Sequence, residues 1–253
     1  MPPIFLHMAM AADIERDLAA PALANERGTY LFGATTPDIR VITRWDRERT
    51  HFFDLGNLGH QDSVAGFFEA HPELADAGRL EAATAAFIAG YISHLALDET
   101  YIQQLYRPHF GQLSALGGDL SANTMDRMLQ YELERRRREE PDTVHEIRAA
   151  LASSSLAVDI GFLDSETLRR WLEVATDQAQ HPADWERFRH LSRRHLSGLG
   201  IESEAEWVRF RETIPDLLRR TIAHVSTAEV DAFLEQGTER ARRAIAQYLG
   251  TAA

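Results

Sequence analysis

Apolar residues recur every three to four positions along most of this chain, which is the spacing of one face of an α-helix. Segments that alternate apolar and polar residues, as half-buried strands do, are rare. The pattern predicts an all-α fold without internal repeats or low-complexity linkers. We expect helices over residues 4–19, 63–71, 80–106, 123–139, 142–152, 165–178, 183–197, 203–225 with a break at Pro215, and 227–248.

Several helix ends are marked by their residues. Asp164 and Ser203 offer side-chain oxygens just before apolar periodicity begins, which is typical of helix N-caps. Pro108 is expected to interrupt the chain after the central helix, and Pro141 to stop the helix before it.

Residues 28–62 are the exception to the helical pattern, because this connection of about 35 residues has weak periodicity of any kind. Connections longer than about 15 residues in a compact domain are usually functional or disordered. Its many aromatic and aliphatic side chains oppose disorder. We therefore expect an ordered, functional loop, and it contains Asp38 and His51.

Length and composition set the wider limits. At 253 residues and 44% hydrophobic, the chain can form a large single domain. We expect a metal-binding helical core in residues 1–140 and C-terminal helices in residues 141–253 packed on the same domain. The first apolar stretch is too short to cross a bilayer and has no basic leader, so we expect a soluble, cytoplasmic protein. Cysteine is absent, so any metal must be held by His, Asp, Glu, backbone or water.

The net charge of the chain limits the classes of molecule that it is expected to bind. A net charge of −12 argues against a general nucleic-acid surface or stable membrane association, because phosphate binding depends on clustered cations. Lysine is absent, so every basic residue except histidine is an arginine. The run "ERRRREE" at residues 134–140 mixes both signs along one helix and is expected to form a solvated, salt-bridged face. A small-molecule substrate fits this charge better, and the oligomeric state is left open.

The stretch "AFIAGYISHLALDETY" at residues 86–101 places His94 and Asp98 on one face of an otherwise apolar helix. An ionised carboxylate there is strongly penalised unless it is paired, and a bound divalent cation is an effective compensation. Gly90, one turn earlier, allows another backbone or a ligand to approach closely. A plain buried pair of His94 and Asp98 is the alternative.

Four segments in this order resemble the zinc-dependent phospholipase C family, whose fold and metal pattern are shared with the S1/P1-type nucleases. They are "MPPIFLH", "FGATTPDI", "DRERTHF" and "AFIAGYISHLALD", and they lie within residues 1–106. The resemblance implies a multi-helix bundle with a long metal-binding loop, a cluster of up to three zinc ions and metal-activated water that attacks a phosphodiester. No resemblance covers residues 140–253.

Carried over residue by residue, the resemblance implies that Asp38, His51, His94 and Asp98 share one metal ion. It also implies that His7 and Asp98 hold a second ion, with Asp98 as the bridging carboxylate. Histidine and carboxylate ligands in this number suit Zn²⁺ and allow Mn²⁺ or Fe. Asp38 is the residue expected to take part in catalysis.

The third zinc site of the family is incomplete here. The position of its first histidine falls on Gln104, which is a poor zinc ligand, so we expect two ions. His109 and Asp126 are the residues that can replace it, although Asp126 also suits the first turn of a helix. Relatives in the nuclease branch use a free terminal amine as a ligand, and Pro2 stands at the corresponding distance from His7.

Arginines in the long connection and after the central helix can clamp a phosphate, although an exposed, solvated side chain is the expected role of each. They are Arg40, Arg44, Arg47, Arg49 and Arg107. The sequence thus favours a zinc-dependent hydrolase of a small phosphoester. Two alternatives stay open: a biosynthetic or tailoring enzyme with the same metal site, and a non-catalytic, metal-stabilised interaction protein.

Overall fold

The computed structural model describes residues 2–251, and within them the fold is all-α with no strand, as the hydrophobic pattern predicts. The α-helices are α1 (Ile4–Leu18), α2 (Pro21–Asn25), α3 (Arg27–Gly33), α4 (Arg40–Thr43), α5 (Glu48–His51), α6 (Ser63–Ala70), α7 (Ala82–Tyr101), α8 (Leu120–Arg138), α9 (Pro141–Leu151), α10 (Ser165–Gln180), α11 (Trp185–Leu191), α12 (Arg193–Gly198), α13 (Glu204–Val225) and α14 (Thr227–Leu249). Three short 3-10 helices, η1 (Thr36–Ile39), η2 (Pro72–Leu74) and η3 (Ala77–Arg79), and one π-helix, η4 (Ile102–Phe110), complete the set.

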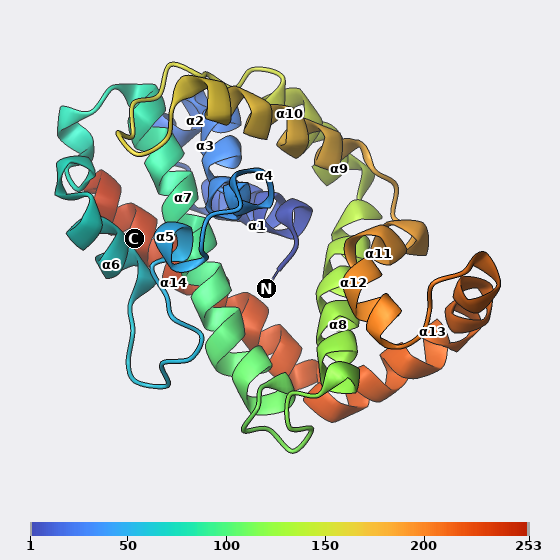
Figure 1. Ribbon diagram of the computed structural model, residues 1–253. Coiled ribbons are helices and arrows are strands. Elements are labelled where there is room, and N and C mark those ends of the chain that lie inside the picture. The colour runs from blue at the N-terminus through green and yellow to red at the C-terminus, as the bar shows by residue number, and fades with distance from the viewer. Residues whose placement is uncertain (1, 252–253) are drawn as a thin grey trace.

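Helix α7 is the centre of the molecule and packs most extensively against α14 and α3 (Figure 1). Nearly all of its side chains are buried, because neighbouring helices cover every face. The main hydrophobic core runs from Phe5 in α1 to Tyr248 in α14 and so includes both halves of the chain. A smaller core joins α8 to α11, α12 and α13, with Phe188 and Trp207 fully buried in it. The expected division into a metal-binding core of residues 1–140 and C-terminal helices of residues 141–253 stays a prediction.

The long connection is more helical than expected, since residues 27–51 form α3, η1, α4 and α5. These helices have four to seven residues, which is too short for a hydrophobic period to be visible. Residues 34–35 and 44–47 join these helices, and residues 52–62 are irregular. The expectation of an ordered segment is confirmed, and the expectation of a loop is wrong for its first two thirds.

Two expected interruptions are absent. Helix α13 continues through Pro215, which is exposed, so water can satisfy the carbonyl one turn earlier that loses its amide partner. Pro108 lies inside η4, where wider turns replace the α-helical bonds and the Gly111 amide donates to the Tyr106 carbonyl at 2.7 Å. Conversely, residues 183–197 form two helices rather than one, with Ser192 between them.

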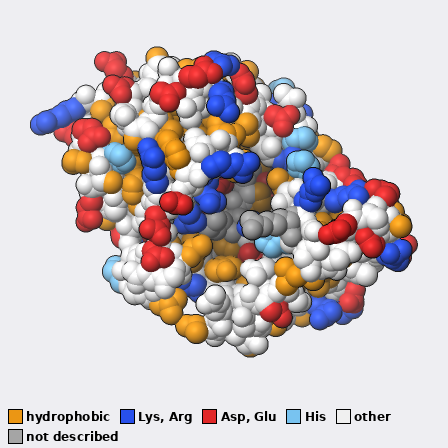
Figure 2. Space-filling model, viewed as in Figure 1, with side chains coloured by type: hydrophobic (Ala, Val, Ile, Leu, Met, Phe, Trp, Pro, Cys, Tyr) orange, Lys and Arg blue, Asp and Glu red, His pale blue; other side chains and the backbone are white. Residues whose placement is uncertain are grey.

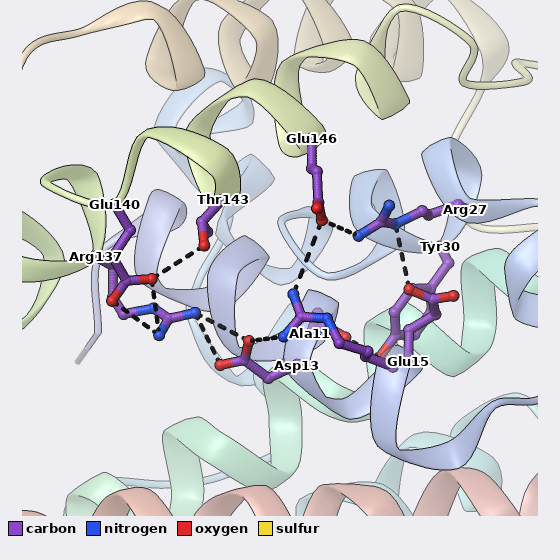
Figure 3. A network of polar contacts seen from close by, with 10 residues as sticks. Ala11, Asp13, Glu15, Arg27, Tyr30, Arg137, Glu140, Thr143 and Glu146 are labelled. Carbon is purple, nitrogen blue, oxygen red and sulfur yellow. Dashed lines mark hydrogen bonds and ion pairs between the residues drawn. The ribbon is translucent and has the colours of Figure 1, made fainter.

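The arginine-rich end of α8 is not a simple solvated face. Arg137 donates to Asp13 of α1 at 2.9 Å, within a network that also joins α1 to α3 and α9 (Figure 3). Arg138 and Glu134 form a buried ion pair at 2.9 Å, and the Arg138 guanidinium also donates to two carbonyls at the end of α10. Arg135 and Arg136 are the members that pair along the helix surface, as expected.

Candidate metal centre

Helix α7 places His94 and Asp98 one turn apart and buries both side chains. The close approach of α3 to α7 orients His94. A Cβ added to Gly90 would lie 2.0 Å from the Tyr30 carbonyl oxygen, so only glycine permits this spacing. The Ala34 carbonyl that follows α3 thereby comes within 2.9 Å of His94 Nδ1. With Nδ1–H donated to this carbonyl, the lone pair of Nε2 is turned to the interior, the arrangement typical of metal-binding histidines.

His7 comes from α1 and stacks on His94, with 3.6 Å between ring centroids and 11° between ring planes. Its side chain is buried, and neither ring nitrogen has a hydrogen-bond partner among the described residues. An apolar helix face rarely buries a histidine with two unpaired nitrogens, because each unpaired polar atom costs about 1–3 kcal/mol. The surroundings of His7 therefore favour a bound ligand.

Asp38 lies in η1 and His51 ends α5, so both come from the connection between α3 and α6. His51 Nδ1 lies 3.0 Å from the Thr50 hydroxyl, and the Tyr91 hydroxyl of α7 donates to the Thr50 carbonyl at 2.6 Å. These contacts anchor α5 on α7 and turn His51 Nε2 inward. That nitrogen lies 3.6 Å from Asp38 Oδ1 and 3.6 Å from Asp98 Oδ2, beyond hydrogen-bond distance.

The five side chains form two overlapping groups whose donor atoms lie within 4.8 Å of one another. One group contains His7, His94 and Asp98, and the other contains Asp38, His51 and His94. His94 is the shared member, whereas the sequence predicts sharing by Asp98. One imidazole nitrogen has a single lone pair and binds one ion, whereas the two oxygens of a carboxylate can bind two ions. The assignment of ligands to individual ions therefore stays a prediction.

The unpartnered atoms at this centre fit a metal ion. Within residues 2–251, no hydrogen-bond partner reaches His51 Nε2, His94 Nε2, Asp98 Oδ1 or either nitrogen of His7. These atoms are buried and converge from α1, α5 and α7. Neutral imidazoles and carboxylates are the donors that Zn²⁺, Mn²⁺ and Fe accept. The structure thus contains a buried His/Asp centre able to hold a metal, whose identity is open.

Burial keeps His7 and His94 in the form that binds metals. It lowers the pKa of His94 to about 4 and, together with the neighbouring His94, lowers the pKa of His7 well below its usual value. For Asp38, burial alone would raise the pKa, but His51 and the other histidines shift it below its ordinary value. His7 and His94 are therefore neutral near pH 7, beside an ionised Asp38.

Arg47 is the residue at this centre that sequence reasoning placed wrongly. Its guanidinium forms an ion pair with Asp98 Oδ2 and donates to the Phe53 carbonyl, and its side chain is only 11% exposed. Burial would raise the pKa of Asp98, but the charge of Arg47 lowers it, so the carboxylate stays ionised. No local signal in the sequence indicates this partner, because Asp98 lies 51 residues later in the chain.

The candidates for a third ion lie outside both groups of donors. Gln104 donates to Gln236 of α14 on another side of α7, where a charged groove of about 960 Å³ runs between α1, α7 and α14. His109 Nε2 lies 3.2 Å from Glu229 Oε1 at the start of α14. Asp126 accepts hydrogen bonds from Tyr101 and Gln130. Pro2, by contrast, is buried and lines a cavity together with Asp38.

Comparisons of the chain with protein-family models, with curated proteins and with solved structures found no match in any of the three. Membership of a family is therefore not shown, and the function is argued from the centre itself. Among the described residues, no helix is both long and apolar enough to span a membrane.

The depressed histidine pKa values predict how the stability of the metal-free protein depends on pH. In the unfolded chain these imidazoles titrate near pH 6.5, so between about pH 6.5 and 4 the unfolded state binds more protons. The free energy of unfolding is expected to fall with decreasing pH in this window, by up to about 1.4 kcal/mol per pH unit for each histidine. Urea denaturation of chelator-treated protein at pH 7, 6 and 5 measures it.

Replacement of His94 by glutamine is expected to reduce this slope, whereas replacement of the exposed His145 leaves it unchanged. Equal slopes in the wild type and His94→Gln would show that His94 titrates normally in the folded protein.

Proposed function

We propose that this protein is a metal-dependent hydrolase of a small phosphoester, with a mechanism like that of the zinc-dependent phospholipase C family. The observation that carries the proposal is the convergence of three buried histidines with Asp98 and Asp38, because within residues 2–251 no hydrogen-bond partner reaches His7, the Nε2 atoms of His51 and His94, or Asp98 Oδ1. Two Zn²⁺ ions are the preferred content, with Mn²⁺ or Fe as alternatives. Asp38, His51, His94 and Asp98 would hold one ion, and His7 and Asp98 a second.

Asp38 marks the side from which a substrate reaches the centre. Its side chain is 21% exposed and lines a cavity, whereas His7, His51, His94 and Asp98 are buried. A divalent ion at this centre would supply Lewis acidity and a bound water of lowered pKa. The Asp38 carboxylate, ionised near pH 7, lies where it can orient that water and accept its proton. Arg47 balances the charge of Asp98 and keeps it available as a ligand.

Two measurements test the proposal. Elemental analysis of protein purified without added metal is expected to find close to two equivalents of a divalent transition metal. Assays against generic phosphodiesters and phosphomonoesters are expected to show hydrolysis that a chelator abolishes. Bound metal without hydrolysis of either class would favour other chemistry or a purely structural metal. Absence of metal would make the five residues a buried polar cluster and end the proposal.

Asp38→Asn is expected to lower kcat by about 100-fold or more, the usual contribution of one general acid–base group. The melting temperature of the metal-free protein should change little, because the replacement is isosteric and the side chain is partly exposed. Asp46→Asn, at an exposed position nearby, is the matched control and should leave both quantities unchanged. Parallel losses of folding and activity in Asp38→Asn would instead assign Asp38 a structural role.

A further inference from the structure

A cavity of about 240 Å³ lies beside Asp38 and is lined by the segment that precedes α1, by α4 and by α8, α11 and α12. Drug-sized ligands occupy pockets of about 300–1,000 Å³, so this cavity fits a smaller molecule. Arginine side chains, the blue groups in Figure 2, gather around the hollow in the middle of this face. Arg40 and Arg127 are the two that line the cavity.

Two arginines and two carboxylates line the cavity. Within the part of the chain that the structure describes, neither Arg40 nor Arg127 forms an ion pair with a carboxylate. The Glu134 carboxylate is occupied by the Arg138 guanidinium at 2.9 Å and by the Phe5 amide at 3.3 Å. The charge of Asp38 would be balanced by the metal ion that it is proposed to hold, so the two guanidinium groups favour an anionic ligand.

A chain of buried hydrogen bonds positions Arg127. The Tyr101 hydroxyl of α7 donates to Asp126 Oδ1 at 2.7 Å, and Gln130 Nε2 donates to Asp126 Oδ2, also at 2.7 Å. Gln130 Oε1, whose orientation is set in this way, accepts from Arg127 Nη1 at 3.1 Å. Tyr101, Asp126 and Gln130 are all nearly inaccessible to solvent. Such a network fixes the guanidinium before any ligand arrives, which lowers the entropy cost of binding.

Helix α11 contributes an apolar part of the cavity lining. It consists of Phe188, which is buried, and Leu191, which is 50% exposed. The cavity therefore offers cations and an apolar surface next to the metal centre, which suits an anion that carries a compact organic group.

We infer that this cavity binds the substrate as a compact organic phosphate, with Arg127 gripping the phosphoryl oxygens and α11 contacting the organic group. The part of this inference that makes the bound anion a substrate rests on the proposed function. Arg127 supplies positive charge next to Asp126, which belongs to neither group of metal donors among the described residues. Asp126 acts as a positioning residue through Gln130 and not as a metal ligand.

Phenylphosphonate is a suitable probe, because its P–C bond resists hydrolysis. Titration calorimetry is expected to show binding to the wild-type protein and a dissociation constant about 10- to 100-fold higher in Arg127→Gln, the factor for one lost charge-assisted hydrogen bond. Arg136→Gln is the matched control, because Arg136 lies on the same helix, is 55% exposed and pairs with Glu132. Its dissociation constant should be that of the wild type.

The monomethyl ester of the probe distinguishes a diester from a monoester. Binding of the ester as tight as that of phenylphosphonate indicates a diester-type ligand, and weaker binding indicates a monoester.

A second pair of variants avoids the buried network. Leu191→Asp places a negative charge in the lining of the cavity at an exposed position and is expected to weaken binding at least fivefold without loss of folding. Leu199→Asp, at a similarly exposed position outside the cavity, should have no effect. Absence of binding by the wild type, or unchanged affinity in both Arg127→Gln and Leu191→Asp, overturns the inference.

Failure of the two proposals can be told apart. If the protein hydrolyses phosphoesters but neither variant changes probe affinity, the anion site is wrong and the hydrolase stands. If the purified protein binds no metal yet shows Arg127-dependent probe binding, the hydrolase is wrong and the anion site stands.

Discussion

Replacement of His94 by alanine is expected to remove the bound metal and the stability that comes with it. His94 belongs to both groups of donors, so its loss weakens each of them. Structural zinc binds with about 10–16 kcal/mol shared among about four ligands, so one lost ligand corresponds to about 3 kcal/mol, or roughly a hundredfold in Kd. Elemental analysis after dialysis and the melting temperature with and without Zn²⁺ measure the two effects.

In the wild type, Zn²⁺ at a hundred times its Kd should stabilise the fold by about 2.7 kcal/mol, and in His94→Ala this gain should nearly vanish. His145→Ala, at an exposed position on α9, is the control and should keep the full gain. Full metal content in His94→Ala would refute the assignment of the centre and leave His94 and Asp98 as a plain buried pair.

Replacement of Gly90 by alanine is expected to destabilise the protein by about 3 kcal/mol, although alanine is normally preferred to glycine inside a helix by about 1 kcal/mol. The added Cβ would lie 2.0 Å from the Tyr30 carbonyl oxygen and 2.7 Å from the Ala34 amide nitrogen. Both are backbone atoms of the α3 region and cannot rotate away. Because α3 must then move off α7, the Ala34 carbonyl loses its contact with His94 Nδ1, and metal affinity should fall as well.

Chemical denaturation of the metal-free protein measures the change in stability separately from metal binding. Gly66→Ala in α6 is the matched control, because its Cβ would meet only the Phe52 side chain and carbonyl at 3.3–3.4 Å. We expect its stability to stay within about 1 kcal/mol of the wild type. A Gly90→Ala protein as stable as Gly66→Ala would contradict the close crossing of α3 and α7.

The long helices could be predicted from the sequence because each carries its own apolar period, and the observed α1, α8, α10 and α14 begin and end close to the expected residues. The short helices of residues 27–51 could not, since four to seven residues hold less than two full turns. The behaviour of Pro215 was predicted wrongly, because a proline breaks a helix only where its surroundings leave the freed carbonyl unsatisfied.

At the candidate site, too, some features could be predicted from the sequence and others could not. Gly90 was expected to permit a close approach, and the structure confirms this and identifies the approaching backbone as α3. Arg47 was expected on the surface and instead pairs with Asp98, which lies 51 residues later in the chain. No local pattern distinguishes a solvated arginine from one whose partner is brought to it by folding.

By itself, the sequence determined the helical class of this protein, the position of its long helices and the unusual presence of His94 and Asp98 on an apolar helix, since these properties depend on neighbours within a few turns. Only the tertiary structure decided that His7, Asp38 and His51 meet that pair, that Arg47 balances Asp98 and that Arg127 faces a cavity beside Asp38. These contacts join segments far apart in the chain. They depend on how α1, α3, α7 and α8 pack, and that packing follows from the shape of whole helix surfaces rather than from any local spacing.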